Sequence, residues 1–135
     1  MLDVPFQYIV YSYYHQQTVA YLLRKLGNYF EAKNMWEWEA LPLIKIDESA
    51  TSPVPDISIC SNMAIEAFIE ITETAAFKHE FNKAIDLAEK HDIAEVFVFD
   101  RKKSTWRKYK QGVGEITENP SFCDSIGYDL NDFLK

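Results

Sequence analysis

Residues 64–100, AIEAFIEITETAAFKHEFNKAIDLAEKHDIAEVFVFD, decide the fold expected for this chain. Residues 64–72 and 94–100 are apolar runs of strand length, and the second is nearly continuous, as in strands buried on both faces. Between them, Phe77, Phe81 and Ile85 recur at helical spacing. A strand, a helix and a second strand in this order form a crossover unit whose two strands lie parallel in one sheet. The stretch therefore predicts an α/β protein.

The flanking segments extend this unit in both directions. Residues 15–30 place apolar side chains at helical spacing, and residues 34–46 alternate tryptophan and glutamate, which is typical of a strand with one exposed face. Residues 57–60 and 104–110 are further expected strands, and the acidic tail is expected to end in a short helix near residues 124–134. The whole pattern predicts an α/β fold with a central mixed β-sheet flanked by α-helices.

Composition limits the class of protein. The 135 residues, of which 47% are apolar, suffice for one domain with its own hydrophobic core, so we expect residues 1–135 to form a single domain. No segment resembles a secretory signal or a membrane span, which implies a cytoplasmic protein with no membrane partner. Cys60 and Cys123 lack the spacing of a zinc site or a redox pair, so both are expected to be reduced structural thiols.

Charge is unevenly distributed along the chain. The net charge of −7 argues against a polyanionic partner, but residues 101–110, RKKSTWRKYK, hold 6 of the 14 basic residues. Arg107 and Lys108 of this patch are candidate nucleic-acid contacts, because the aromatic side chains between the cations could stack on bases. Charge that protects an exposed strand edge, or ordinary cross-strand pairing, explains the same pattern.

Two carboxylates interrupt stretches that otherwise have the composition of buried strands. Asp56 follows Pro55 at the start of one stretch, and Glu70 lies within AFIEI of the next. Burial of an unpaired charge is costly, so each carboxylate needs a partner. Because carboxylates on neighbouring strands can converge on one oxygen-ligated cation, Asp56 and Glu70 are candidate ligands of Mg²⁺. The structural alternatives are a turn hydrogen bond for Asp56 and an ion pair between Glu70 and Lys83.

Four motifs occur in an order that resembles a known superfamily. YSYYHQQTVAYLLRKL at 11–26 is similar to S-x-x-H-x-x-hydrophobic-x-x-x-L at the opening of a helix, and VPDISIC at 54–60 resembles PD followed by an apolar strand. FIEI at 68–71 resembles a strand acid, and DIAEVFVFD at 92–100, after a lysine-bearing helix, resembles G-V-x-E-Y-W-hydrophobic-hydrophobic-D. The set resembles the PD-(D/E)XK nuclease superfamily, and within it the Uma-two family, whose members are classed as restriction endonucleases.

The resemblance implies a restriction endonuclease-like sheet, a phosphodiesterase site that uses Mg²⁺ or Mn²⁺, and DNA as the substrate. It places the metal on Asp56 and Glu70. Lys83, on the helix that follows, is the first candidate for the catalytic lysine, and Lys78 is the second. His15 is expected to point toward a substrate phosphate or a site water, unless it is a helix cap or a surface residue.

The chain also departs from the family pattern. Thr72 lies two positions after Glu70, where the superfamily motif has a lysine, and residues 73–75 replace the family's S-P-S/T segment. These differences, with the acidic total, favour an alternative in which a catalytically inactive protein keeps the nuclease fold for protein interaction or DNA binding. Many nucleases of this type pair, and the aromatic content permits a homodimer.

Overall fold

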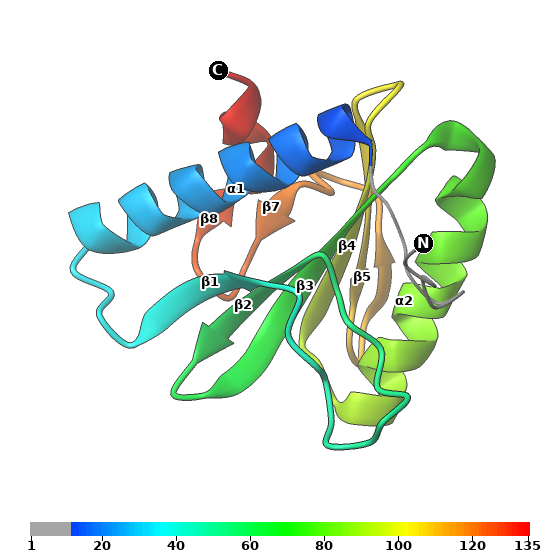
Figure 1. Ribbon diagram of the computed structural model, residues 1–135, viewed down its shortest axis with the longest axis horizontal. Helices are drawn as coiled ribbons and strands as arrows, with labels where there is room; N and C mark the ends of the chain where they lie inside the picture. Colours follow the sequence, from blue (N-terminus) through cyan, green and yellow to red (C-terminus); the bar gives the residue numbers. More distant parts are fainter. Residues whose placement is uncertain (1–11) are drawn as a thin grey trace, which may run out of the picture.

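A six-stranded sheet lies between two helices in the computed structural model, which describes residues 12–135 (Figure 1). Helix α1 (Tyr13–Ala32) crosses one face of the sheet, and helix α2 (Phe77–His91) covers the other. This arrangement confirms the prediction of an α/β fold with helices on both sides of a mixed sheet. The first residue of the helix motif predicted at 11–26 lies outside the described range.

The strand order follows the order of the sequence. Neighbours in the sheet are β1 (Trp38–Pro42), β2 (Ile57–Ser61), β3 (Ala64–Thr72), β4 (Glu95–Asp100), β5 (Thr105–Lys110) and β6 (Gly114–Ile116). Strands β3 and β4 are parallel, whereas the other neighbouring pairs are antiparallel. Helix α2 connects β3 to β4, so the crossover unit predicted from residues 64–100 is confirmed.

Successive side chains of each strand point to opposite faces, so the sheet divides the apolar residues into two cores. The core beneath α2 contains Phe68, Phe81, Ala84, Ala88, Ile93, Val96 and Val98. The larger core beneath α1 contains Leu22, Leu26, Phe30, Ile57, Ile59, Ile69, Phe97, Phe99 and Trp106, together with Leu130 and Phe133 near the C-terminus. Strand β4 contributes to both cores and all six of its residues are buried, as its continuous apolar run predicts.

Strand β1 is shorter than the run predicted at residues 34–46. Asn34 and Leu43 have positive φ angles of 56° and 50°, which break the extended backbone before and after the strand. Trp36 therefore lies in a turn with 71% of its surface exposed, while Trp38 packs toward Phe30 with 6.3 Å between ring centroids. The two tryptophans do not share a strand face.

The helix predicted near residues 124–134 is largely replaced by other structure. Strands β7 (Phe122–Cys123) and β8 (Tyr128–Asp129) form a small hairpin, and only the 3-10 helix η2 (Leu130–Leu134) is helical. Gly127, with φ of 64°, turns the chain between the two strands and interrupts any longer helix.

The cysteines agree with the expectation of structural thiols. Cys60 and Cys123 are both buried and free. Within residues 12–135, no helix has the length and apolar character that a membrane crossing requires.

Candidate functional site

Strands β2 and β3 bring Asp56 and Glu70 together. Ile57 pairs with Ile69, so the antiparallel register places Asp56 and Glu70 on the next rung. The backbone N–H of Asp56 donates a 2.7 Å hydrogen bond to Oε1 of Glu70. Asp56 is almost fully buried, with 4% of its surface exposed. Two acids that are 14 residues apart in sequence are therefore direct neighbours.

The Asp56 carboxylate links β3 to the start of α1. Its Oδ2 accepts a 2.8 Å hydrogen bond from the backbone N–H of Ile71 and lies 3.2 Å from Nε2 of His15. Ser12 caps α1 by accepting a hydrogen bond from the N–H of His15, which holds this histidine in the first helical turn. Burial lowers the pKa of His15, but the hydrogen bond and the charge of Asp56 outweigh burial and raise it above the usual value.

Glu70 has no directly bonded Lys or Arg among residues 12–135. Burial, and then the negative charge of Asp56, raise the pKa of Glu70 to about 8. The charge of Lys83 acts in the opposite direction, but Glu70 forms no ion pair with any Lys or Arg within residues 12–135. The ion pair considered as the structural role of Glu70 is therefore not formed.

Glu70 and Lys83 nevertheless line the same small pocket, on the α2 side of the sheet. The pocket has a volume of about 60 Å³, and Glu80 of α2 also lines it, beside Pro55 and Phe68. Lys78, the second candidate for the catalytic lysine, is exposed and does not line this pocket. Of the two lysines, Lys83 is thus the one that lies beside a predicted ligand.

A second, larger pocket of about 420 Å³ lies at the carboxyl end of β3. His15, Thr72, Glu73 and Arg101 line it, with Ser12 of the helix cap. His15 of this pocket contacts the carboxylate of Asp56, but Asp56 itself lines neither pocket. The two predicted metal ligands are thus neighbours through the backbone of Asp56, with Glu70 beside the smaller pocket and Asp56 behind His15 of the larger one.

The donor chemistry of this pair suits a hard divalent cation. Within residues 12–135, no three His, Cys, Asp or Glu side chains are grouped as a metal site. Mg²⁺, however, commonly takes only one or two protein carboxylates and keeps its remaining ligands as water and phosphate. Since the charge of Asp56 raises the pKa of Glu70, a cation beside them would relieve this repulsion. Asp56 and Glu70 therefore supply the kind of oxygen donor that Mg²⁺ and Mn²⁺ prefer.

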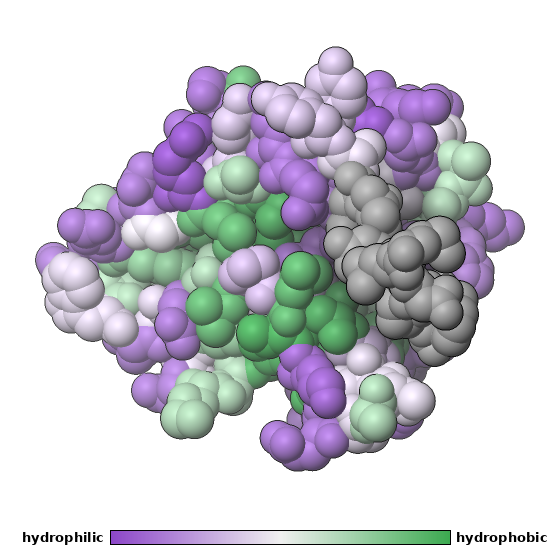
Figure 2. Space-filling view, viewed as in Figure 1, coloured by the Kyte–Doolittle hydropathy of each residue, from purple (hydrophilic) through white to green (hydrophobic). Residues whose placement is uncertain are grey.

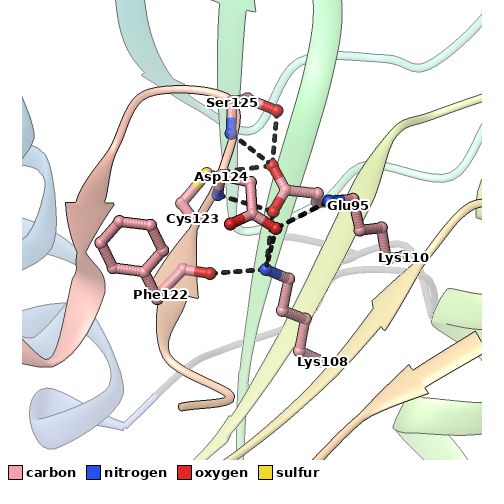
Figure 3. A network of polar contacts seen from close by, with 7 residues as sticks. All are labelled: Glu95, Lys108, Lys110, Phe122, Cys123, Asp124 and Ser125. Atoms are coloured by element: carbon pink, nitrogen blue, oxygen red, sulfur yellow. Dashed lines mark hydrogen bonds and ion pairs between the residues drawn. The ribbon is translucent and has the colours of Figure 1, made fainter. Parts of the chain in front are cut away.

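Arg107 and Lys108, the predicted nucleic-acid contacts, are engaged with the protein. Arg107 donates two hydrogen bonds to Glu115, of 2.9 and 2.8 Å, and its guanidinium lies 4.1 Å from the ring centroid of Phe81. Lys108 is 1% exposed, and its Nζ contacts carboxylates of Glu95 and Asp124 and the carbonyl of Phe122 (Figure 3). Strand alternation turns Lys108 inward, so its ammonium is closed off from a polyanion.

Two residues at the end of β4 were missed by the sequence analysis. Arg101 lines the larger pocket, and its charge affects the pKa of His15. Asp100 is fully buried and accepts hydrogen bonds from the hydroxyl of Thr74 and from the N–H groups of Lys102 and Lys103. The predicted parallel pairing of the strands now seen as β3 and β4 could have pointed to them, because the carboxyl ends of parallel neighbours lie at the same edge of the sheet.

Comparison with known proteins supports the fold. The sequence matches no protein-family model and no curated protein. Among solved structures, the chain is similar to a protein from Anabaena variabilis described as "a putative nuclease belonging to DUF820", a family that is the same as Uma-two. The likeness covers 96% of this chain and 87% of that chain, with a TM-score of 0.70 and 16% sequence identity. At this identity, the likeness shows a shared fold with a protein of that description.

Proposed function

We propose that this protein is a metal-dependent DNA endonuclease that hydrolyses phosphodiester bonds. The observation that carries the proposal is the pair of adjacent acids on neighbouring strands, the buried Asp56 and the half-buried Glu70, with no Lys or Arg of residues 12–135 bonded to either one. The similarity to the Anabaena variabilis protein adds support from the fold. Perturbed carboxylates beside a pocket are frequent at catalytic sites.

The roles of the residues follow from their positions. Asp56 and Glu70 would hold Mg²⁺ or Mn²⁺, which when bound supplies Lewis-acid stabilisation of the phosphate and lowers the pKa of a water. Lys83, beside Glu70, would stabilise negative charge on the phosphate. His15 orients the carboxylate of Asp56 through its 3.2 Å contact and lines the pocket where a phosphate would approach.

The direct test is Mn²⁺ binding by calorimetry together with nicking of supercoiled plasmid DNA. Asp56→Asn and Glu70→Gln keep side-chain volume but remove charge, and each is expected to reduce both metal binding and nicking strongly. Glu66→Gln is the matched control, because Glu66 is also on β3 and lies outside the pocket that Glu70 lines. Wild-type protein that neither binds Mn²⁺ nor nicks DNA would refute the proposal.

A catalytically inactive protein that keeps this fold for DNA binding or protein interaction is the second candidate. Thr72 at the position of the strand lysine favours it, as do the different pockets beside Asp56 and Glu70. This candidate predicts DNA binding without nicking, and binding that survives Asp56→Asn and Glu70→Gln.

We also propose that the protein forms a homodimer through the β1 edge of the sheet. Strand β1 is at the edge of the sheet, and the neighbouring Trp36 and Leu43 are 71% and 54% exposed. Figure 2 shows apolar residues gathered in the middle of this face, over β1 and the neighbouring part of the sheet, with hydrophilic residues around them. Sedimentation equilibrium is expected to show a dimer that Trp36→Ser weakens; a monomeric wild type would contradict this part.

A further inference from the structure

The basic segment at residues 101–110 is divided by the fold into cations that are engaged and cations that remain at the surface. Arg107 is bonded to Glu115, Lys108 is buried, and Lys110 lies 3.0 Å from Asp124. The remaining basic residues, Arg101, Lys102 and Lys103, lie in the turn between β4 and β5. Arg101 is bonded to Glu73, whereas Lys102 and Lys103 are exposed, so the exposed lysines of this segment are in the turn rather than on the strand.

This turn lies at the rim of the larger pocket. Arg101 lines the pocket, and its backbone N–H donates a 2.8 Å hydrogen bond to the carbonyl of Thr72 at the end of β3. Its guanidinium lies 5.4 Å from the ring centroid of Tyr14, which holds the side chain beside the start of α1. The turn is thus fixed to the two elements that carry His15 and Thr72.

The three cations of the turn outnumber the two carboxylates beside them, Glu73 and Asp100. Glu73 bonds Arg101 and lies 3.5 Å from Lys102, so one carboxylate serves two cations. Lys103 is exposed and forms no ion pair within the described part of the chain. The side chain of Lys102 is 61% exposed, so its ammonium is accessible to a ligand.

The buried carboxylate of Asp100 determines the shape of the turn. It accepts the N–H groups of Lys102 and Lys103 at 3.0 and 3.2 Å, and its other oxygen accepts the hydroxyl of Thr74 at 2.7 Å. Because Asp100 directs the backbone of the turn in this way, the lysine side chains start from a rigid base. A preorganised set of cations loses less entropy on binding than a flexible tail does.

From these contacts, we infer that Arg101, Lys102 and Lys103 form a phosphate-binding rim, and that DNA approaches Asp56 over this rim through the larger pocket. The smaller pocket, lined by Glu70, Glu80 and Lys83, holds a single cation and has about one seventh of the volume. The three cations at the rim of the larger pocket attract a phosphate more strongly than Lys83 alone does. The inference rests on the proposed function, since it takes DNA as the ligand.

The test is binding of a fluorescein-labelled 20-base-pair duplex, measured by anisotropy in EDTA at several salt concentrations. Lys102→Gln combined with Lys103→Gln is expected to weaken binding about tenfold and to reduce the slope of log K against log salt by about two. Both side chains are exposed, so the double variant removes no core contact.

A matched control removes the same charge elsewhere. Lys33 and Lys90 are exposed residues at the ends of α1 and α2 that are remote from the pocket, about 30 and 20 Å along each helix. Lys33→Gln combined with Lys90→Gln is expected to bind as the wild type does. Equal losses in both double variants, or no loss in the rim variant, would overturn the inference, as would a wild type that does not bind the duplex.

Removal of a negative charge beside the turn provides a second test. Glu73→Gln removes the carboxylate that compensates Arg101 and Lys102, so it is expected to tighten DNA binding several-fold. Unchanged or weaker binding would contradict the rim.

The nicking assay tests the phosphate-binding rim separately from the proposed endonuclease activity. DNA binding that depends on the rim, without nicking by the wild type, would support the rim and refute the endonuclease. Nicking that requires Asp56 but is unaffected in the rim variant would refute the rim alone.

Discussion

Two buried clusters of charge in this molecule differ in how their charges are compensated. At the first, Nζ of Lys108 contacts Glu95 and Asp124 at 2.8 and 2.9 Å and donates a further hydrogen bond to the carbonyl of Phe122 (Figure 3). Burial opposes the charge of Glu95, but hydrogen bonds from Lys108 and Ser125 hold its pKa below the usual value. At the second, Asp56 and Glu70 are adjacent without a bonded Lys or Arg among residues 12–135, and the pKa of Glu70 rises to about 8.

This contrast distinguishes a structural cluster from a candidate site. In the network around Lys108, the charged groups are bonded to one another, and these bonds connect β4 and β5 to the segment that contains β7. At the acid pair, His15 contacts Asp56 but Glu70 forms no ion pair among residues 12–135, which is destabilising unless a ligand is bound. The pKa of Glu70 is thus raised at the acid pair, whereas the pKa of Glu95 is lowered in the network around Lys108.

The largest expected effect is at the saturated cluster. Lys108→Met leaves Glu95 buried without its cation and is expected to lower the free energy of unfolding by about 3–5 kcal/mol. Lys110→Met is the control, since Lys110 contacts the same Asp124 from a more exposed position and should cost less than about 1 kcal/mol. Urea denaturation measures both; equal losses would mean that burial does not distinguish the two lysines.

The next effect is a pH dependence at the acid pair. Glu70 ionises near its ordinary pKa of 4.5 in the unfolded chain but near 8 in the folded one, so metal-free protein should lose stability progressively as pH rises between these values. Glu70→Gln should remove most of this loss. Glu95 has the opposite sign, because its lowered pKa means that its contribution is lost only as pH falls below its ordinary range.

Thermal unfolding from pH 4.5 to 8.5, with and without Mn²⁺, measures this dependence. Mn²⁺ is expected to restore stability at the upper end in the wild type but not in Glu70→Gln. A wild-type profile that is flat over this range would show that the negative charge of Asp56 is compensated in some other way.

The smallest effect concerns the histidine that contacts the acid pair. His15→Gln removes the 3.2 Å contact with Asp56 and is expected to cost about 1 kcal/mol of stability and to weaken Mn²⁺ binding about tenfold. His79→Gln on the exposed side of α2 is the control and should change neither quantity. Calorimetric titration with Mn²⁺ checks the prediction, and unchanged affinity in His15→Gln would exclude a role for His15 in positioning Asp56.

The elements near the centre of the sheet were predictable because their patterns are local. The helical spacing of Phe77, Phe81 and Ile85 and the apolar run that became β4 each depend on neighbours in sequence. The predicted β1 was too long and the C-terminal helix was mostly wrong, because single residues with positive φ, Leu43 and Gly127, ended or redirected the chain. Such backbone conformations leave little trace in hydrophobic periodicity.

The candidate site was predictable only in part. PD and FIEI indicated two acids on adjacent strands, and the register of β2 with β3 brings Asp56 and Glu70 together. The contact of His15 with Asp56 spans 41 residues, and no local pattern specifies it. Which pocket lies beside each carboxylate depends on the helices that cover the two faces of the sheet.

The sequence by itself determined the kinds of element, the parallel pairing in residues 64–100 and the presence of acids in buried strands, because these follow from side-chain periodicity along the chain. Only the tertiary structure decided which cations are available. Lys108 and Lys110 are two residues apart on β5, yet the C-terminal segment buries the ammonium of Lys108 and leaves Lys110 partly exposed. Side-chain alternation along a strand predicts which residues share a face. It does not predict which of these residues a segment remote in sequence will cover, and this covering determines which charged side chains remain accessible to a ligand.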